Sequence, residues 1–255
     1  MPCAWRCAGS VVAAAPVPGF RLQPGAFDGA IIDLDGTLVD TVGDFVAAIN
    51  LMLRDLWPEP LTLLTVDATT VETMVGKGSE NLVRSVLNHA QAQVKHAQQA
   101  IDLIAKYDQA FARYQHHYQA VSGLYSSVYP GVPEGLRALQ AAGLKLACVT
   151  NKPAGFARPL LALKGLDGFF SEVFGGDSFE RKKPDPMPLL KTCEALGTLP
   201  ARTLMIGDSS NDAAAARAAG CPVVLVTYGY NHGVPVLKVD ADGFVDSLAA
   251  LLAHK

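Results

Sequence analysis

Residues 30–40 read AIIDLDGTLVD, an apolar run that leads directly into two carboxylates two positions apart. Continuous apolar runs of this kind are typical of parallel strands that are covered on both faces. We therefore predict a short buried strand over residues 30–32 that ends at Asp33. Asp35 can face the same crevice as Asp33. Gly36 and Thr37 permit a tight turn whose N–H groups can face an anion.

Three further apolar runs predict strands over residues 144–149, 204–206 and 223–226. Between and around them lie helical patterns over residues 133–142, 153–164, 185–196 and 211–219, each of which stops at a glycine. Because predicted strands and helices alternate, we expect a doubly wound, Rossmann-like α/β core built on a parallel sheet.

Residues 42–128 interrupt this alternation, because they contain no convincing strand and several stretches with a helical period. The clearest runs over residues 96–118, where Ile104, Phe111, Tyr114 and Tyr118 fall near one stripe. We predict an inserted all-helical cap over residues 42–128. The α/β core is then expected over residues 25–41 and 129–255, after a disordered leader over residues 1–24.

The composition of the chain excludes several classes of protein. The formal net charge is −3, 18% of the 255 residues are charged, and no Lys/Arg-rich run exists, so a nucleic-acid partner is not expected. No apolar run is long enough to span a bilayer. The five cysteines are scattered without metal-ligand spacing, which favours free thiols in a reducing compartment and therefore a cytoplasmic location. A monomer and a homodimer both remain open.

Polar side chains follow three of the four predicted strands, namely Asp33, Thr150 and Asp208. Ligands of open parallel sheets bind in the crevice beyond the carboxyl ends of the strands. Any one of these residues could simply cap a following helix, but three together indicate a site. Asp208 and Asp212 stand four apart at the start of a predicted helix. With Asp33 they supply oxygen ligands of the kind that Mg²⁺ prefers.

The sequence DLDGTLVDT at residues 33–41 resembles the first motif of the haloacid dehalogenase superfamily of phosphatases. This resemblance implies that Asp33 is a nucleophile that forms an aspartyl-phosphate. It also implies that Asp35 is the general acid and base, and that the backbone carbonyl of Asp35 helps to bind the metal.

The remaining motifs of the superfamily follow in order. Residues 149–151 resemble the second motif, which implies that Thr150 and Asn151 bind the phosphoryl group. Lys183, directly before Pro184, matches the lysine that neutralises phosphate. Residues 206–212 resemble the fourth motif. The resemblance implies an Mg²⁺ ion bound by Asp33, Asp35 and Asp208, with Asp212 supporting the site from close by.

Within the superfamily, residues 74–79, 175–177 and 227–231 are most similar to bacterial phosphoglycolate phosphatases. This similarity implies a small phosphorylated substrate, 2-phosphoglycolate, that is hydrolysed to glycolate and phosphate. The cap must then recognise the carboxylate of that substrate. Our candidate is the turn at residues 76–79, where Lys77 adds a cation beside the free N–H groups of a helix N-terminus.

Several alternatives remain open. The same motifs suit a phosphatase for another small metabolite such as a sugar phosphate, and a phosphomutase of the same superfamily. A haloacid dehalogenase needs no magnesium, and the Asp-x-Asp pattern argues against it. A binding module without catalytic activity would be expected to lack at least one of the motif residues, and all of them are present.

Overall fold

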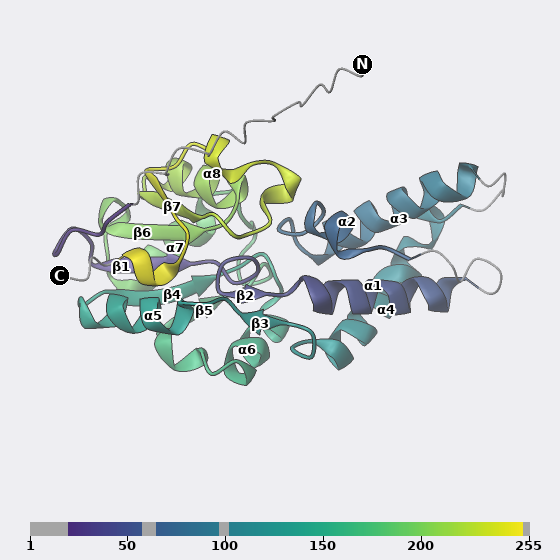
Figure 1. Cartoon of the computed structure of the whole chain (residues 1–255), viewed down its shortest axis with the longest axis horizontal. Helices are drawn as coiled ribbons and strands as arrows, with labels where there is room; N and C mark the ends of the chain where they lie inside the picture. Colours follow the sequence, from purple (N-terminus) through teal and green to yellow (C-terminus); the bar gives the residue numbers. More distant parts are fainter. Residues whose placement is uncertain (1–19, 58–64, 97–101, 252–255) are drawn as a thin grey trace, which may run out of the picture.

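The computed structural model describes residues 20–57, 65–96 and 102–251. These residues form an α/β core at one end and a helical block at the other (Figure 1). The core is built on a six-stranded parallel sheet with the strand order β5-β4-β1-β6-β7-β8. Its strands are β1 (Gly29–Ile32), β4 (Lys145–Val149), β5 (Glu172–Phe174), β6 (Thr203–Gly207), β7 (Val223–Val226) and β8 (Gly243–Val245). The predicted α/β fold class is confirmed.

Helices cover both faces of this sheet, which explains why its strands read as continuous apolar runs. On β1, Ala30 and Ile32 pack into a hydrophobic cluster with one pair of helices, and Ile31 packs into a cluster with the other pair. The first pair is α5 (Val132–Ala141) and α6 (Ala154–Leu163); the second is α7 (Met187–Leu196) and α8 (Ser210–Ala219).

The helical block has a hydrophobic cluster of its own, in which the fully buried rings of Tyr114 and Tyr118 stack on one another. It contains α1 (Val42–Leu56), α2 (Ala68–Glu72), α3 (Ser79–His96) and α4 (Tyr107–Val121). Two short strands, β2 (Val39–Asp40) and β3 (Ser127–Val128), pair antiparallel where the chain enters and leaves the block. The sequence predicts no strand at β3, because two residues are too few to show a pattern.

The predicted helix over residues 96–118 is wrong at its start. Helix α3 ends at His96, and α4 begins only at Tyr107, after the 3₁₀ turn η2 (Ile104–Lys106). The Asp102 carboxylate accepts hydrogen bonds from the backbone N–H groups of Ile104 and Ala105 at 3.0 and 3.1 Å and so starts a new turn. Ile104 is consequently 49% exposed and does not lie on the buried stripe. Residues 97–101 lie outside the described residues.

The core begins earlier than residue 25. The backbone N–H of Leu22 donates to the carbonyl of Leu251 at 2.8 Å, and the Leu22 side chain is buried in the core. The backbone N–H of Phe20 donates to the carbonyl of Phe244 in β8. Phe20 and Leu22, which we expected to belong to the leader, therefore belong to the core, and residues 1–19 lie outside the described residues.

Short 3₁₀ turns complete the described chain. They are η3 (Asp167–Phe169), η4 (Pro200–Arg202), η5 (Asn231–Gly233), η6 (Val236–Lys238) and η7 (Leu248–Leu251).

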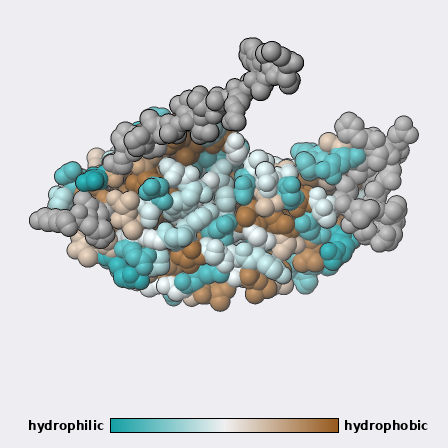
Figure 2. Space-filling model, in the orientation of Figure 1, coloured by the Kyte–Doolittle hydropathy of each residue, from teal (hydrophilic) through white to brown (hydrophobic). Residues whose placement is uncertain are grey.

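Hydrophilic and hydrophobic residues are intermixed on the face of the molecule that Figure 2 shows. Among the described helices, none has both the length and the apolar character that crossing a membrane requires.

Candidate active site

Three neighbouring strands bring the predicted polar residues to one edge of the sheet. Asp33 follows β1, Thr150 follows β4 and Asp208 follows β6. Since β1 lies between β4 and β6, the three strand ends are adjacent. The backbone N–H of Asp33 donates to the carbonyl of Ile206 at 2.9 Å, which continues the sheet ladder up to the site. The sheet thus fixes the position of Asp33.

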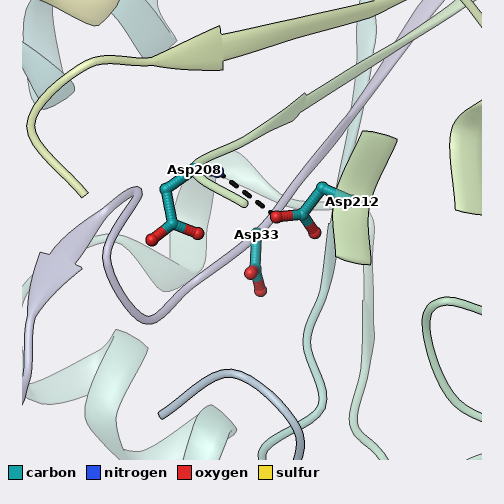
Figure 3. Close-up of side chains that lie close together, drawn as sticks. All are labelled: Asp33, Asp208 and Asp212. Carbon is teal, nitrogen blue, oxygen red and sulfur yellow. Dashed lines mark hydrogen bonds between the residues drawn. The ribbon is translucent and has the colours of Figure 1, made fainter. Parts of the chain in front are cut away.

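Three buried carboxylates converge at this edge (Figure 3). Asp33, Asp208 and Asp212 each offer an oxygen, and these oxygens lie within 4.8 Å of one another. Burial raises the pKa of Asp33 to about 7, against the opposing charge of Lys183. Burial, followed by the charges of Asp212 and Asp33, raises the pKa of Asp208 well above its usual value. A divalent cation would stabilise the ionised carboxylates, so these residues fit Mg²⁺.

Glycines leave the space that Asp208 occupies. A Cβ atom on Gly36, whose φ is +82°, would lie 2.2 Å from the Asp208 Oδ2 atom. A Cβ on Gly229 would lie 2.1 Å from the Asp208 Cβ. Any side chain at either position would displace the Asp208 carboxylate. The turns on both sides of the site therefore depend on glycine.

Asp212 lies in the first turn of α8 and is held by the N-terminus of that helix. Its Oδ2 atom accepts hydrogen bonds from the backbone N–H and the hydroxyl of Ser209 at 3.1 and 2.8 Å, which completes a capping box at the start of α8. Its Oδ1 atom accepts from Lys183 at 2.7 Å. Both oxygens are therefore engaged, and Asp212 connects the N-terminus of α8 to Lys183.

The ammonium of Lys183 lies in the middle of this arrangement. It lies 2.8 Å from the carbonyl of Val149, 2.7 Å from Asp212 and 3.0 Å from Asp33. Three neighbouring oxygens match the three donors of an ammonium group. Burial alone would lower the pKa of Lys183, but the charges of Asp212 and Asp33 outweigh it and the pKa is raised. Lys183 therefore remains a cation beside Asp33.

Asp35 lines a cavity in front of Asp33, between the core and the helical block. Its Oδ1 atom accepts from the Thr41 hydroxyl and from the Lys152 ammonium, each at 2.7 Å. Its side chain does not belong to the carboxylate cluster of Asp33. The two donors hold Asp35 at the cavity wall.

Thr150 and Asn151 both line this cavity, and the side-chain amide of Asn151 is held by two backbone carbonyls. The Asn151 Nδ2 atom donates to the backbone carbonyls of Gly76 and Lys183 at 2.9 and 2.8 Å. Both amide protons are thereby taken. Phosphate binding by Asn151 stays a prediction, and in this structure its side-chain N–H groups join the helical block to the loop of Lys183.

Lys77 does not contribute its cation to the cavity. The side chain of Lys77 is exposed. From the same turn, the described residues that line the cavity are Gly76, Gly78 and Ser79. Gly76 and Gly78 adopt φ values of +102° and +91°, so the turn presents its backbone rather than the Lys77 side chain. Our prediction of Lys77 as the substrate-binding cation is therefore not supported.

Lys152 is a charged residue of the cavity wall that the sequence did not indicate. It lies in the cavity wall with Phe45, Tyr114 and Tyr118. A lysine after a strand is normally solvated, so nothing in the sequence marked it except its place directly after Thr150 and Asn151.

The cavity measures about 30 Å³, which is room for one or two water molecules. Residues of the helical block therefore cover this cavity.

Comparisons with known proteins agree with this geometry. A family model described as haloacid dehalogenase-like hydrolase matches residues 27–220. The phosphoglycolate phosphatase of Thiobacillus denitrificans is 45% identical over 88% of this chain and 95% of its own length. The plasmid-encoded phosphoglycolate phosphatase of Cupriavidus necator is 46% identical over 88% of this chain and 90% of its own. The crystal structure of a predicted phosphoglycolate phosphatase from Haemophilus somnus has a TM-score of 0.80, with 35% identity over 88% of this chain and 96% of that one.

Proposed function

Since this chain belongs to the haloacid dehalogenase-like hydrolase family, we propose that it is a magnesium-dependent phosphatase that hydrolyses 2-phosphoglycolate to glycolate and phosphate. The observation that carries the proposal is the buried cluster in which Lys183 contacts both Asp33 and Asp212, next to Asp208. The relatives that are named phosphoglycolate phosphatases support the substrate.

In the first step of the proposed reaction, a carboxylate oxygen of Asp33 attacks phosphorus. The bond between phosphorus and the bridging oxygen breaks, and an aspartyl-phosphate forms. Asp35 gives its proton to the departing glycolate oxygen. Lys183 lies 3.0 Å from Asp33 and offsets the repulsion between the anionic carboxylate and the anionic phosphoryl group.

In the second step, Asp35 takes a proton from a water molecule that attacks the phosphorus of the aspartyl-phosphate. The bond from phosphorus to Asp33 breaks, phosphate is released, and both carboxyl groups return to their starting forms. Thr150, at the cavity wall, donates to the phosphoryl oxygens in both steps.

Asp33, Asp208 and the backbone carbonyl of Asp35 would hold the Mg²⁺ ion, with Asp212 supporting them. When bound, the ion supplies positive charge that stabilises the phosphoryl oxygens in the transition state. We further propose that residues 42–128 act as a cap. It opens to admit substrate and closes to exclude water.

The proposal is tested by measuring phosphate release from a panel of esters with Mg²⁺ present. The panel contains 2-phosphoglycolate, several sugar phosphates and p-nitrophenyl phosphate. We expect the highest kcat/KM for 2-phosphoglycolate. Faster hydrolysis of a sugar phosphate would contradict 2-phosphoglycolate as the preferred substrate. Conversion of a sugar phosphate to its isomer without release of phosphate would indicate a phosphomutase.

A further inference from the structure

The ammonium of Lys152 is buried at the boundary between the core and the helical block. Its side chain is 3% exposed, and its Nζ atom lies 2.7 Å from the Asp35 Oδ1 atom. The same atom lies 4.4 Å from the ring centroid of Phe45 and 5.0 Å from that of Tyr118. A buried cation is costly unless it is paired. The Oδ1 atom of Asp35 and two aromatic faces stabilise this one.

Lys152 has donors to spare, whereas Lys183 does not. An ammonium group carries three N–H donors. Within the described part of the chain, Asp35 is the one hydrogen-bond acceptor for the Lys152 ammonium. Lys183 already faces three oxygens. The cavity thus contains a cation with unused donors that is not committed to the phosphoryl site.

The Tyr114 hydroxyl is a second donor in the same cavity wall. It is fully buried and, among the described residues, has no hydrogen-bond partner of good geometry, although Ser79 lies near it. Burial raises the pKa of Tyr114 well above its usual value, so the hydroxyl keeps its proton. A buried hydroxyl without a partner is costly, and a ligand oxygen would relieve that cost.

The proposed reaction places the substrate beside Lys152, in the cavity that Tyr114 also lines. Asp35 must reach the bridging oxygen of the ester in order to protonate it. In 2-phosphoglycolate the carboxylate carbon stands two bonds beyond that oxygen. A group in contact with Asp35 is therefore close to where the carboxylate must lie.

We propose that Lys152 and the Tyr114 hydroxyl bind the carboxylate of the substrate and so make the site selective for small phosphorylated acids. The inference rests on the proposed phosphatase function and names the residues that set its substrate class. Val75 and Leu82 also line this cavity and belong to the hydrophobic cluster of the helical block.

The test compares 2-phosphoglycolate with ethyl phosphate, which has the same number of carbon atoms but no carboxylate. Lys152→Met keeps the aliphatic stem and removes the charge. We expect kcat/KM for 2-phosphoglycolate to fall about tenfold or more, with a higher KM, and the ratio between the two substrates to fall by a similar factor. Tyr114→Phe, which removes a single oxygen, should lower the same ratio about fivefold.

Matched variants separate this role from others. Lys77→Met and Lys182→Met remove solvent-accessible lysines near the same boundary and should leave the ratio unchanged. Lys152→Arg keeps the charge and should retain most of the preference. It also provides a readout if Lys152→Met fails to fold, because a folded Lys152→Arg variant that hydrolyses both substrates equally well would argue against a charge contact.

Two results would overturn the inference while leaving the phosphatase intact. The first is an equal loss on both substrates in Lys152→Met, which would mean that Lys152 acts only by holding Asp35. The second is an unchanged ratio of kcat/KM between the two substrates in Tyr114→Phe, which would show that the Tyr114 hydroxyl does not bind the carboxylate. If the wild-type protein shows no preference for 2-phosphoglycolate over ethyl phosphate, the proposed substrate itself fails.

Discussion

The side-chain amide of Asn151 donates a hydrogen bond of 2.9 Å to the backbone carbonyl of Gly76. Asn151 follows β4 of the core, and Gly76 belongs to the turn that leads into α3 of the helical block. The same carbonyl accepts a second hydrogen bond, of 3.1 Å, from Asn211 at the start of α8. One oxygen of the helical block is thus held from both sides of Asp33, and these hydrogen bonds join the block to the edge of the sheet that carries Asp33.

Asn211→Ala removes one of these two hydrogen bonds without touching Lys183. A hydrogen bond of this kind contributes about 1 kcal/mol, so the closed state should become less populated and KM should rise about fivefold. Steady-state kinetics with 2-phosphoglycolate measure the change. Asn88→Ala, which alters an exposed residue of α3, is the control. A variant with the KM of the wild-type protein would show that the contact does not contribute to closure.

Asp33→Asn should lower kcat by at least about 10³-fold, because an amide is a poor nucleophile. The fold should persist, because the change preserves shape and removes a carboxyl that is costly to ionise when buried. Phosphate release and thermal unfolding measure the two effects. Asp167→Asn, on the exposed turn η3, should retain full activity. Near-normal turnover in Asp33→Asn would exclude the aspartyl-phosphate.

Chelation of Mg²⁺ should abolish activity, and its effect on stability should depend on pH. Folding raises the pKa of Asp33 from 3.8 to about 7, so the folded protein binds this proton more tightly than the unfolded chain does. The resulting stabilisation is complete below about pH 4 and is lost as the pH rises through 7. Mg²⁺ binds the ionised carboxylates, so the increase in Tm that it produces should be larger at pH 8 than at pH 5.5.

Thermal unfolding with and without a chelator at the two pH values measures this difference. In Asp33→Asn, the Mg²⁺-induced increase in Tm should differ less between pH 8 and pH 5.5. The reason is that this variant lacks one of the carboxyl groups that exchange a proton for the metal. Equal increases at both pH values in the wild-type protein would contradict the assignment of the buried carboxylates as metal ligands.

Gly229→Ala should impair metal binding and catalysis together, since the added Cβ would stand 2.1 Å from the Asp208 Cβ. We expect a loss of about tenfold or more in kcat/KM and a higher Mg²⁺ requirement. Gly155→Ala is the matched control. Gly155 lies in α6 with no atom within 4 Å of an added Cβ, so alanine should leave activity intact and stabilise the protein by about 0.5–1 kcal/mol. Equal activity of the two variants would refute the close packing around Asp208.

The sequence predicted those parts of the fold in which several buried residues lie in one run. Strands β1, β4, β6 and β7 contain four or five residues each and were identified, whereas β5 and β8 contain three and were not. The sequence also indicated that Asp33, Thr150 and Asp208, each at the end of a predicted strand, belong to one site. The strand order that makes these three ends adjacent comes from the structure.

Contacts that depend on the direction of a side chain could not be predicted in this way. Spacing placed Lys77 in a turn near the site, but the backbone conformation of Gly76 and Gly78 leaves its side chain exposed. Lys152 is separated from Asp35 by 117 positions, and no local pattern reports a contact over that distance. The break before α4 depends on the two local hydrogen bonds that Asp102 accepts, which a periodic stripe does not reveal.

The central place of β1 in the sheet has a consequence for how the molecule loses activity on heating. The N–H of Asp33 is bonded to Ile206 of the neighbouring strand, so this amide can exchange with solvent hydrogen only when the middle of the sheet separates. The edge strands β5 and β8 can open first without moving Asp33. Amide protons at the reactive centre should therefore be among the slowest in the protein to exchange, and thermal inactivation through the core should coincide with its cooperative unfolding.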